Sequence, residues 1–405
     1  CIFRFFEDPD RADLPWDTAW VRKLHREFKS MGWNSIRYCI GFPPRFWYDI
    51  ANEEGLLIQD EYPIWTGPSW KANKSFLKYY PNVTPVSLAD EFKAWMQAHW
   101  NHPCVVIWDA QNESMNTITG EAIKSVRHLD LSDRPWENGW AAPDRLTDPI
   151  ESHPYRFSKY LKDESPKNPL KELISMPQIP DNSASKWTPP TDGGLYPNPI
   201  IINEYAWIWL NRDGTPTRLT DKVYERCFPD DTTSEQRLET YAKHLGILTG
   251  HWRAHRKCAG VLHFCGLGYS RSEEPRGQTS DHFIDIKNLT FDPSFVKYVK
   301  PAFNPVGVFL DWFENEVIVG QTIIVNAIII NDLNKTIEAD MQLGWDSDSL
   351  QMPVSEKISL LPFEKKDLQF NIVAPLNMCK CDLVLSITYD GRIIESRRET
   401  RVNKN

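Results

Sequence analysis

The chain has 405 residues, of which 41% are hydrophobic and 25% are charged, values typical of a globular protein. Its formal net charge of −9 argues against nucleic acid or an anionic membrane as a partner, because both favour a basic face. The sequence contains no run of about 20 apolar residues and therefore predicts no membrane span.

Tryptophan is frequent, with 17 residues. Indole rings suit the apolar faces of sugars, but a large aromatic core would use them equally well. The eight cysteines show neither metal-ligand spacing nor a dense disulfide framework, so we expect buried free thiols. His99, His102 and His128 are not spaced from one another and from an acidic residue as zinc ligands are. We therefore expect neither a metal nor a cofactor.

From residue 1 to about 300, short apolar runs alternate with segments of helical periodicity, which is typical of repeated β/α units. The expected strands lie at residues 2–6, 35–40, 56–61, 104–113, 133–138, 152–155, 199–204 and 259–264. Eight strands are the number that an α/β fold of the (β/α)8 TIM barrel type needs.

Helix boundaries are suggested by capping residues. Asp17 should cap a helix that ends near Gly32, and the S-x-x-D pattern at Ser87 should cap another. Thr233 should open a helix that continues through Leu245.

Two long segments have no expected secondary structure. Residues 62–86 are rich in aromatic side chains, and residues 165–200 hold eight prolines. Loops of this length usually serve as lids or binding walls.

Beyond about residue 303 the apolar period changes from 3.6 to 2. The expected strands of this region lie at residues 322–331, 340–345, 367–372 and 382–387. Their regular spacing predicts an immunoglobulin-like β-sandwich. We therefore expect a barrel domain at residues 1–302 and a sandwich domain at residues 303–405.

Two glutamates each close an apolar strand-like run, Glu113 in CVVIWDAQNE and Glu204 in PIIINE. An α/β barrel places its chemistry at the C-terminal ends of its strands. Cleavage of a glycosidic bond requires at least two carboxyl groups that face one pocket. With retention of configuration, one is an ionised nucleophile and the other a protonated acid, about 5–5.5 Å apart.

A set of short motifs resembles glycoside hydrolase family 2, which includes β-galactosidases, β-glucuronidases and β-mannosidases. The resemblance covers about residues 1–300. The motifs are Arg37, Trp47-Tyr48-Asp49, the run from Gly55 to Glu61, Asn101-His102-Pro103, Asn112-Glu113 and Asn203-Glu204-Tyr205.

The resemblance implies a role for each matching residue. Glu113 resembles the acid/base and Glu204 the nucleophile. Asn112 matches the asparagine that binds the sugar 2-hydroxyl, and Arg37 matches the arginine that holds the nucleophile. Tyr155 occupies the place of a tyrosine on the sixth strand.

Three further side chains are candidate substrate contacts: Trp207, His153 and His263. Trp207 follows Glu204 closely and should lie near the rim of the pocket. Either histidine could equally be a satisfied structural residue. Arg37 could instead pair with a structural acid such as Asp60 or Glu61.

Two segments depart from the family pattern, residues 39–44 after the second strand and residues 263–265 on the eighth. Both segments belong to the subsite that recognises the sugar. The family core also has two β-domains ahead of the barrel, so we expect this chain to be the later part of a longer polypeptide. We expect a secreted or periplasmic location, and the sequence leaves the oligomeric state open.

These observations predict a retaining exo-β-glycosidase, β-galactosidase-like, that releases terminal sugars from oligo- or polysaccharides. Exo action is expected because the segments 62–86 and 165–200 would wall off a pocket. A non-catalytic carbohydrate-binding protein with a degenerate barrel is the alternative. A third hypothesis is a scaffold fragment whose barrel is inactive without its leading domains.

Overall fold

A computed structural model describes residues 1–66, 72–175, 181–270, 277, 279–347 and 352–404. By its internal contacts the chain divides into two compact units. The first comprises residues 1–163, 179–238 and 257–292, and the second comprises residues 164–178, 239–256 and 293–405. The proposed domain boundary between residues 302 and 303 stays a prediction.

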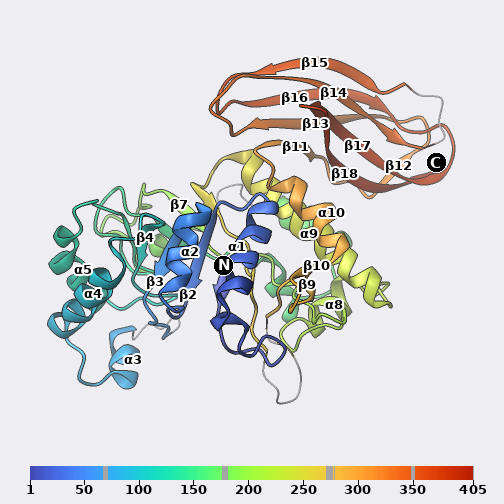
Figure 1. Ribbon diagram of the computed structural model, residues 1–405. Coiled ribbons are helices and arrows are strands. Elements are labelled where there is room, and N and C mark those ends of the chain that lie inside the picture. Colours follow the sequence, from blue (N-terminus) through green and yellow to red (C-terminus); the bar gives the residue numbers. More distant parts are fainter. Residues whose placement is uncertain (67–71, 176–180, 271–276, 278, 348–351, 405) are drawn as a thin grey trace. The chain divides into compact units, whose positions relative to one another are not determined.

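The first unit is built on parallel strands taken in chain order (Figure 1). Five of them pair as β1-β2-β3-β4-β5 and three as β6-β7-β8. A parallel bridge from Ile2 to Leu267 brings the chain just after β8 back to β1. The strands are β1 (Ile2–Phe3), β2 (Ser35–Cys39), β3 (Leu57–Glu61), β4 (Val105–Asp109), β5 (Trp136–Glu137), β6 (Ile150–Ser152), β7 (Ile200–Ile202) and β8 (Gly260–Val261).

All eight predicted strands are found, but each is shorter than its expected range, and β6 is also shifted. The prediction of strand 152–155 is wrong in its position, because β6 ends at Ser152. Pro154 lacks the N–H that would continue a ladder. Pro135 has the same effect before Trp136, where β5 begins.

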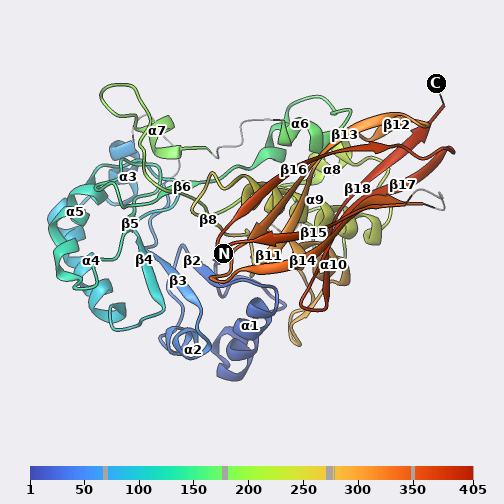
Figure 2. The ribbon, with the colours of Figure 1, turned by 90° about the horizontal axis from the view of Figure 1, so that it is seen from above.

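Four helices lie outside the strands β2 to β5 (Figure 2): α1 (Thr18–Ser30), α2 (Phe46–Glu54), α4 (Pro85–His99) and α5 (Ile118–Val126). Asp17 caps α1 (Thr18–Ser30), as predicted, by accepting hydrogen bonds from the backbone of Ala19 and Trp20. Gly55 ends α2 (Phe46–Glu54) in the left-handed conformation, with φ of 69°. Such a C-terminal residue favours glycine, which has no Cβ.

The prediction that Ser87 caps a helix is wrong, because α4 (Pro85–His99) begins two residues earlier. Thr84 is the cap, and its side chain accepts a hydrogen bond from the Ser87 backbone while the Ser87 side chain accepts one from the Thr84 backbone. Pro85 occupies the first helical position, where no N–H is needed.

The expectation that residues 62–86 form only a loop is also wrong, since α3 (Ala72–Tyr79) lies there. Its Phe76 is buried and contacts the Tyr80 ring. Two short helices likewise interrupt residues 165–200: α6 (Pro169–Ile174), capped by Asn168, and α7 (Ser183–Trp187). Of these two helices, α6 belongs to the second unit and α7 to the first. The remaining described elements of the first unit are α8 (Asp221–Cys227), β9 (Phe283–Asp285), β10 (Thr290–Phe291) and three short 3₁₀ helices.

The second unit contains two sheets, ordered β11-β13-β16 and β12-β18-β17-β14-β15. The predicted strand 322–331 is confirmed as β13 (Thr322–Asn331), and the other three predicted strands lie within β14 (Ile337–Asp346), β16 (Lys365–Val373) and β17 (Cys379–Tyr389). The strands that the apolar pattern did not indicate are β11 (Val306–Asp311), β12 (Glu316–Ile318), β15 (Val354–Leu360) and β18 (Arg392–Asn403).

One apolar core is shared by the two sheets. Val325 and Ile329 of β13 and Leu343 and Leu385 of the larger sheet are fully buried in it. Two sheets that enclose one core in this way form a β-sandwich. The helices α9 (Ser234–His255), from residue 239 on, and α10 (Pro293–Ala302) belong to the same unit.

Among the described residues, no helix combines the length and the apolar character that crossing a membrane requires.

Candidate active site

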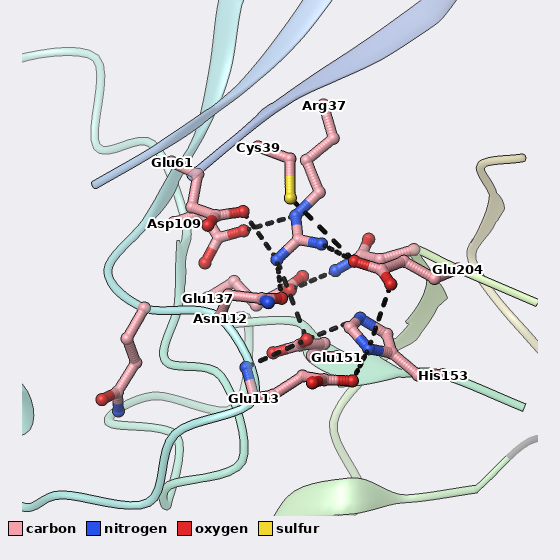
Figure 3. Close-up of polar contacts among 12 residues, drawn as sticks. Arg37, Cys39, Glu61, Asp109, Asn112, Glu113, Glu137, Glu151, His153 and Glu204 are labelled. Carbon is pink, nitrogen blue, oxygen red and sulfur yellow. Dashed lines mark hydrogen bonds and ion pairs between the residues drawn. The ribbon is translucent and has the colours of Figure 1, made fainter. Parts of the chain in front are cut away.

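Chemically active side chains gather where parallel strands of the first unit end (Figure 3). They come from several strands because the carboxyl ends of parallel strands meet at one edge. The residues are Arg37 and Cys39 of β2, Glu61 of β3, Asp109 of β4 with Asn112 and Glu113 after it, Glu137 of β5, Glu151 of β6 with His153 after it, and Glu204 after β7.

The two predicted glutamates face the same space. A carboxylate oxygen of Glu113, a ring nitrogen of His153 and a carboxylate oxygen of Glu204 all lie within 4.8 Å of one another. His153 Nδ1 is 2.8 Å from Glu113 Oε1 and 3.7 Å from Glu204 Oε2. The two carboxyl groups are therefore close enough to act on one atom placed between them.

Arg37 is completely buried and connects the cluster. Its Nη1 donates to Glu204 Oε1 at 2.9 Å, and its Nη2 donates to Asn112 Oδ1 at 2.9 Å. It also pairs with Glu61 at 2.7 Å and with Asp109 at 3.0 Å. Both alternatives for Arg37, a contact to Glu204 and a pair with a structural acid, are therefore present. Its guanidinium fixes Glu204 and Asn112 relative to each other.

Asp60, by contrast, belongs to a different network. Its carboxylate accepts hydrogen bonds from Tyr48 Oη at 2.7 Å and Trp95 Nε1 at 2.8 Å, and it lies 2.6 Å from His99 Nδ1. These contacts bind α2 and α4 to β3.

His153 bridges the carboxylates. Its Nδ1 lies next to Glu113, and its Nε2 lies 2.6 Å from Glu151 Oε1. Burial acts to lower the pKa of His153, but the charges of Glu204 and Glu151 and the hydrogen bonds to Glu113 and Glu151 raise it well above its ordinary value. The raised pKa favours the imidazolium form, which donates from Nδ1 to Glu113 Oε1 and pairs with Glu151 through its charge.

Tyr155 Oη donates a hydrogen bond to Glu204 Oε2. The Trp207 ring meets the Tyr155 ring edge-on at 4.9 Å, and its Nε1 donates to the Leu219 carbonyl. Trp207 has a φ of 82° and Glu113 a φ of 42°, both in the left-handed region. Strained backbone of this kind is concentrated at functional sites. Glu204, Tyr155 and Trp207 thus form one contiguous wall.

His263 lies in another arrangement. Its Nε2 is 2.7 Å from His282 Nε2, and its carbonyl accepts a hydrogen bond from the Cys1 amino group. Burial lowers the pKa of His263 well below the ordinary value. It is a neutral buried residue, and its contact with substrate stays a prediction.

The carboxylates of the cluster outnumber its cations. Glu61, Asp109, Glu137 and Glu151 are completely buried, and Glu113 and Glu204 adjoin them. Burial raises the pKa of Asp109 to about 6 and raises the pKa values of Glu61 and Glu137 well above the ordinary value. Burial therefore favours the protonated forms of Glu61, Asp109 and Glu137.

The two predicted catalytic glutamates differ in acidity. Burial raises the pKa of Glu204, against the positive charges of His153 and Arg37. Burial acts to raise the pKa of Glu113 as well, but the hydrogen bond and charge of His153 outweigh it and lower that pKa. In the free site Glu113 is thus the more acidic of the pair, opposite to the order expected from the mechanism.

Sequence reasoning missed Asp109, Glu137 and Glu151 as members of the site. The signal was present, because each closes or nearly closes a parallel strand, as Glu113 and Glu204 do. Trp65, in the aromatic-rich segment of residues 62–86, donates to Glu113 Oε2 at 3.3 Å and is 44% exposed. Trp70 of the same segment lies outside the described residues.

A family pattern matches residues 8–245 of this chain. The family is described as glycosyl hydrolases family 2, TIM barrel domain. The match covers more than half of the chain and includes Arg37, Glu113 and Glu204.

Among curated proteins, a stretch of 116 residues is 30% identical to a putative β-glucuronidase of Formosa agariphila, covering 28% of this chain and 11% of that protein. Another of 217 residues is 28% identical to a β-galactosidase of Bifidobacterium adolescentis, covering 49% and 20%. This chain thus spans no more than about a fifth of these two relatives.

Among solved structures, a β-D-mannosidase of Dictyoglomus thermophilum has a TM-score of 0.58 at 14% identity, covering 96% of this chain and 48% of that one. An exo-chitosanase of Amycolatopsis orientalis has the same TM-score at 12% identity, covering 96% and 47%. At such identities these structures support the fold.

Proposed function

Because the chain belongs to glycosyl hydrolase family 2, we propose that it carries the active site of a retaining exo-β-glycosidase. The proposal depends on the short distance between Glu113 and Glu204, which have carboxylate oxygens within 4.8 Å of each other. Retaining enzymes hold their carboxyl groups about 5–5.5 Å apart, whereas inverting enzymes need about 6.5–9.5 Å. The shorter spacing favours retention.

In this proposal Glu204 attacks the anomeric carbon while Glu113 gives a proton to the glycosidic oxygen. The bond between that carbon and oxygen breaks, and a glycosyl ester of Glu204 forms. Glu113, now ionised, takes a proton from water, which attacks the same carbon and releases the sugar. Asn112, held by Arg37, would face the sugar 2-hydroxyl.

Arg37 and Tyr155 favour the ionised nucleophile, since both donate hydrogen bonds to the Glu204 carboxylate. Glu113 starts in a less favourable state, because the His153 cation stabilises its ionised form. We propose that a bound sugar separates Glu113 from His153. Once the contact with His153 is lost and water leaves the site, the pKa of Glu113 would rise. Glu113 would then be protonated, as the reaction requires.

The finer features of the protein are also proposals. The similarity to a β-galactosidase over half of the chain favours β-galactosides as the first substrates to test. We propose that the sandwich is immunoglobulin-like, that domains meet near residues 302 and 303, and that β-domains of the same polypeptide precede the barrel. We also propose a secreted or periplasmic location. The proposal leaves the oligomeric state open.

One observation favours the second candidate function, a carbohydrate-binding protein with a degenerate barrel. The ion pair between His153 and Glu113 at 2.8 Å keeps the proposed acid ionised in the free site. A binding protein would keep this pair when a sugar is bound and would cleave no glycoside.

The full-length protein should be tested against aryl β-glycosides, including galactosides, glucuronides, galacturonides and mannosides. We expect Glu204→Gln and Glu113→Gln to lower kcat/KM for the preferred substrate at least about 1,000-fold. Glu121→Gln, an exposed residue of α5, is the control and should keep the wild-type rate.

The two glutamates can be separated with a substrate that has a dinitrophenyl leaving group. Glu113→Ala should still form the glycosyl ester, because this leaving group needs no protonation, and azide should release it as a β-glycosyl azide. Wild-type rates in both glutamine variants, or no hydrolysis of any glycoside by the wild type, would overturn the assignment.

A further inference from the structure

A second group of ligand-type side chains lies in the second unit. His251 and His255 are four residues apart on α9, and Asp311 ends β11. Figure 1 labels both elements. Residues four apart share one face of a helix, so both imidazoles point to the same side. This group is separate from the carboxylate cluster of the first unit and takes no part in the proposed hydrolysis.

The three side chains converge. One ligand atom from each lies within 4.8 Å of the other two. The His251 and His255 ring centroids are 4.5 Å apart, and His255 Nε2 is 3.9 Å from Asp311 Oδ2. His251 and His255 are only 3% and 7% exposed, whereas the Asp311 side chain is 26% exposed.

The close approach of helix and strand is built into the sequence. A Cβ at Gly250 would lie 2.9 Å from the Phe309 ring, so glycine lets α9 pack directly on β11. The His251 and His255 rings both lie edge-on to Phe309, at 6.0 and 6.3 Å. These contacts fix the orientation of the imidazoles before any ligand arrives.

We propose that His251, His255 and Asp311 form a binding site for one divalent transition-metal ion, with Zn²⁺ as the best match. Two imidazole nitrogens and one carboxylate oxygen are a common donor set for this ion. Tetrahedral coordination at about 2.0–2.1 Å places donors about 3.4 Å apart, so small side-chain rotations suffice. The exposed side of Asp311 leaves the fourth position to water.

Arg398, whose charge interacts with that of Asp311, directs its hydrogen bonds to other groups. Arg398 donates to the carbonyls of Leu310 and Arg397 and stacks over the Phe309 and Phe313 rings at 5.0 and 4.8 Å. Its charge is therefore committed to main-chain oxygens and aromatic faces. The bound ion would join α9 to β11 and stabilise the second unit, because it binds the native arrangement of the three ligands.

The test uses the full-length protein after removal of metals by a chelator and dialysis. Zn²⁺ is titrated in competition with a chromophoric chelator, and Co²⁺ is added separately to read its visible absorption bands. We expect one equivalent of Zn²⁺ with micromolar or tighter affinity, tetrahedral Co²⁺ bands, and a rise in the unfolding temperature of roughly 3 °C or more at saturation.

His255→Gln and Asp311→Asn should each weaken binding at least tenfold and remove the thermal shift. His128→Ala, which changes an exposed histidine of the first unit, is the control for adventitious binding and should bind as the wild type does. Glu204→Gln should also bind normally. Circular dichroism confirms that each variant is folded.

Three results would overturn the proposal: no binding of Zn²⁺ by the wild type, equal binding by His255→Gln and Asp311→Asn, or loss of binding in Glu204→Gln, which would place the ion in the carboxylate cluster. None of these readouts depends on glycoside hydrolysis, so the metal site and the proposed enzyme activity fail or stand separately.

Discussion

His153 determines the electrostatic balance between the two glutamates. It is 2.8 Å from Glu113 and 3.7 Å from Glu204, and its positive charge stabilises the ionised form of both. Glu151 holds the opposite side of the ring at 2.6 Å. A single imidazolium thus lowers the pKa of the proposed acid and limits the rise in the pKa of the proposed nucleophile.

Replacing His153 should therefore shift the pH dependence of the reaction. In His153→Asn the pKa values of Glu113 and Glu204 both rise, so both limbs of the bell-shaped profile of kcat/KM against pH move to higher pH. The measurement is kcat/KM for an aryl β-glycoside from about pH 4 to pH 9. A profile that keeps both limbs in place would show that His153 does not control these acids.

Arg37 was singled out by its match to a family 2 motif, and only some of its partners were predicted. The resemblance to family 2 implied the contact to the nucleophile, and the structure places its Nη1 on Glu204 at 2.9 Å. Its simultaneous contacts to Asn112 and Asp109 depend on where β4 ends relative to β2. No local pattern near Arg37 could indicate them.

At the scale of elements, the start of α4 shows how capping decides a boundary. Thr84, Pro85 and Ser87 together form a better start signal than Ser87 and Asp90, because Thr84 and Ser87 satisfy each other's backbone N–H groups. The buried residues of the helix are the apolar Leu88, Phe92, Trp95 and Met96 together with His99.

Thr84→Ala should destabilise the fold by about 1 kcal/mol, because one backbone donor of the first turn loses its partner. Chemical denaturation of the purified protein measures this change. The matched control is Val86→Ala in the same turn, where the side chain is 73% exposed and a change within about 0.5 kcal/mol is expected. Equal effects of the two substitutions would contradict the capping role.

The sandwich strands differ in how well their sequences reveal them. Thr322–Asn331 alternates buried and exposed residues through most of its length, and its bounds were predicted as they are found. Val354–Leu360 buries only Ile358 and Leu360, and Arg392–Asn403 carries six charged residues, so both strands were missed. Their pairing with β14 and β17 supplies the order that their apolar content alone does not indicate.

At the scale of the whole molecule, the buried acids of the first unit link stability to pH. Asp109 has an ordinary pKa of 3.8, which burial raises to about 6. Between these values the folded state holds a proton that the unfolded state releases, so the free energy of unfolding falls as the pH rises. Glu61 and Glu137 act in the same direction.

We therefore expect the protein to lose stability between about pH 4 and pH 6, with Asp109 contributing up to about 3 kcal/mol. Chemical denaturation at pH 4.5, 5.5 and 7 measures the slope. Asp109→Asn should flatten it, because asparagine does not titrate. Asp340→Asn, at an exposed position of β14, should leave the slope unchanged. A wild-type stability that rises through this range would contradict the proposed protonation of the cluster.

The sequence by itself determined the β/α alternation, the approximate positions of seven of the eight strands and the two glutamates, because a strand leaves a local apolar pattern and each glutamate closes such a run. It also carried the family 2 resemblance, which the family match confirms. The tertiary structure alone decided what surrounds these residues. Glu137, Glu151 and the pair His251 and His255 acquire their partners from distant strands, and those contacts depend on how strand ends and helix faces meet in space.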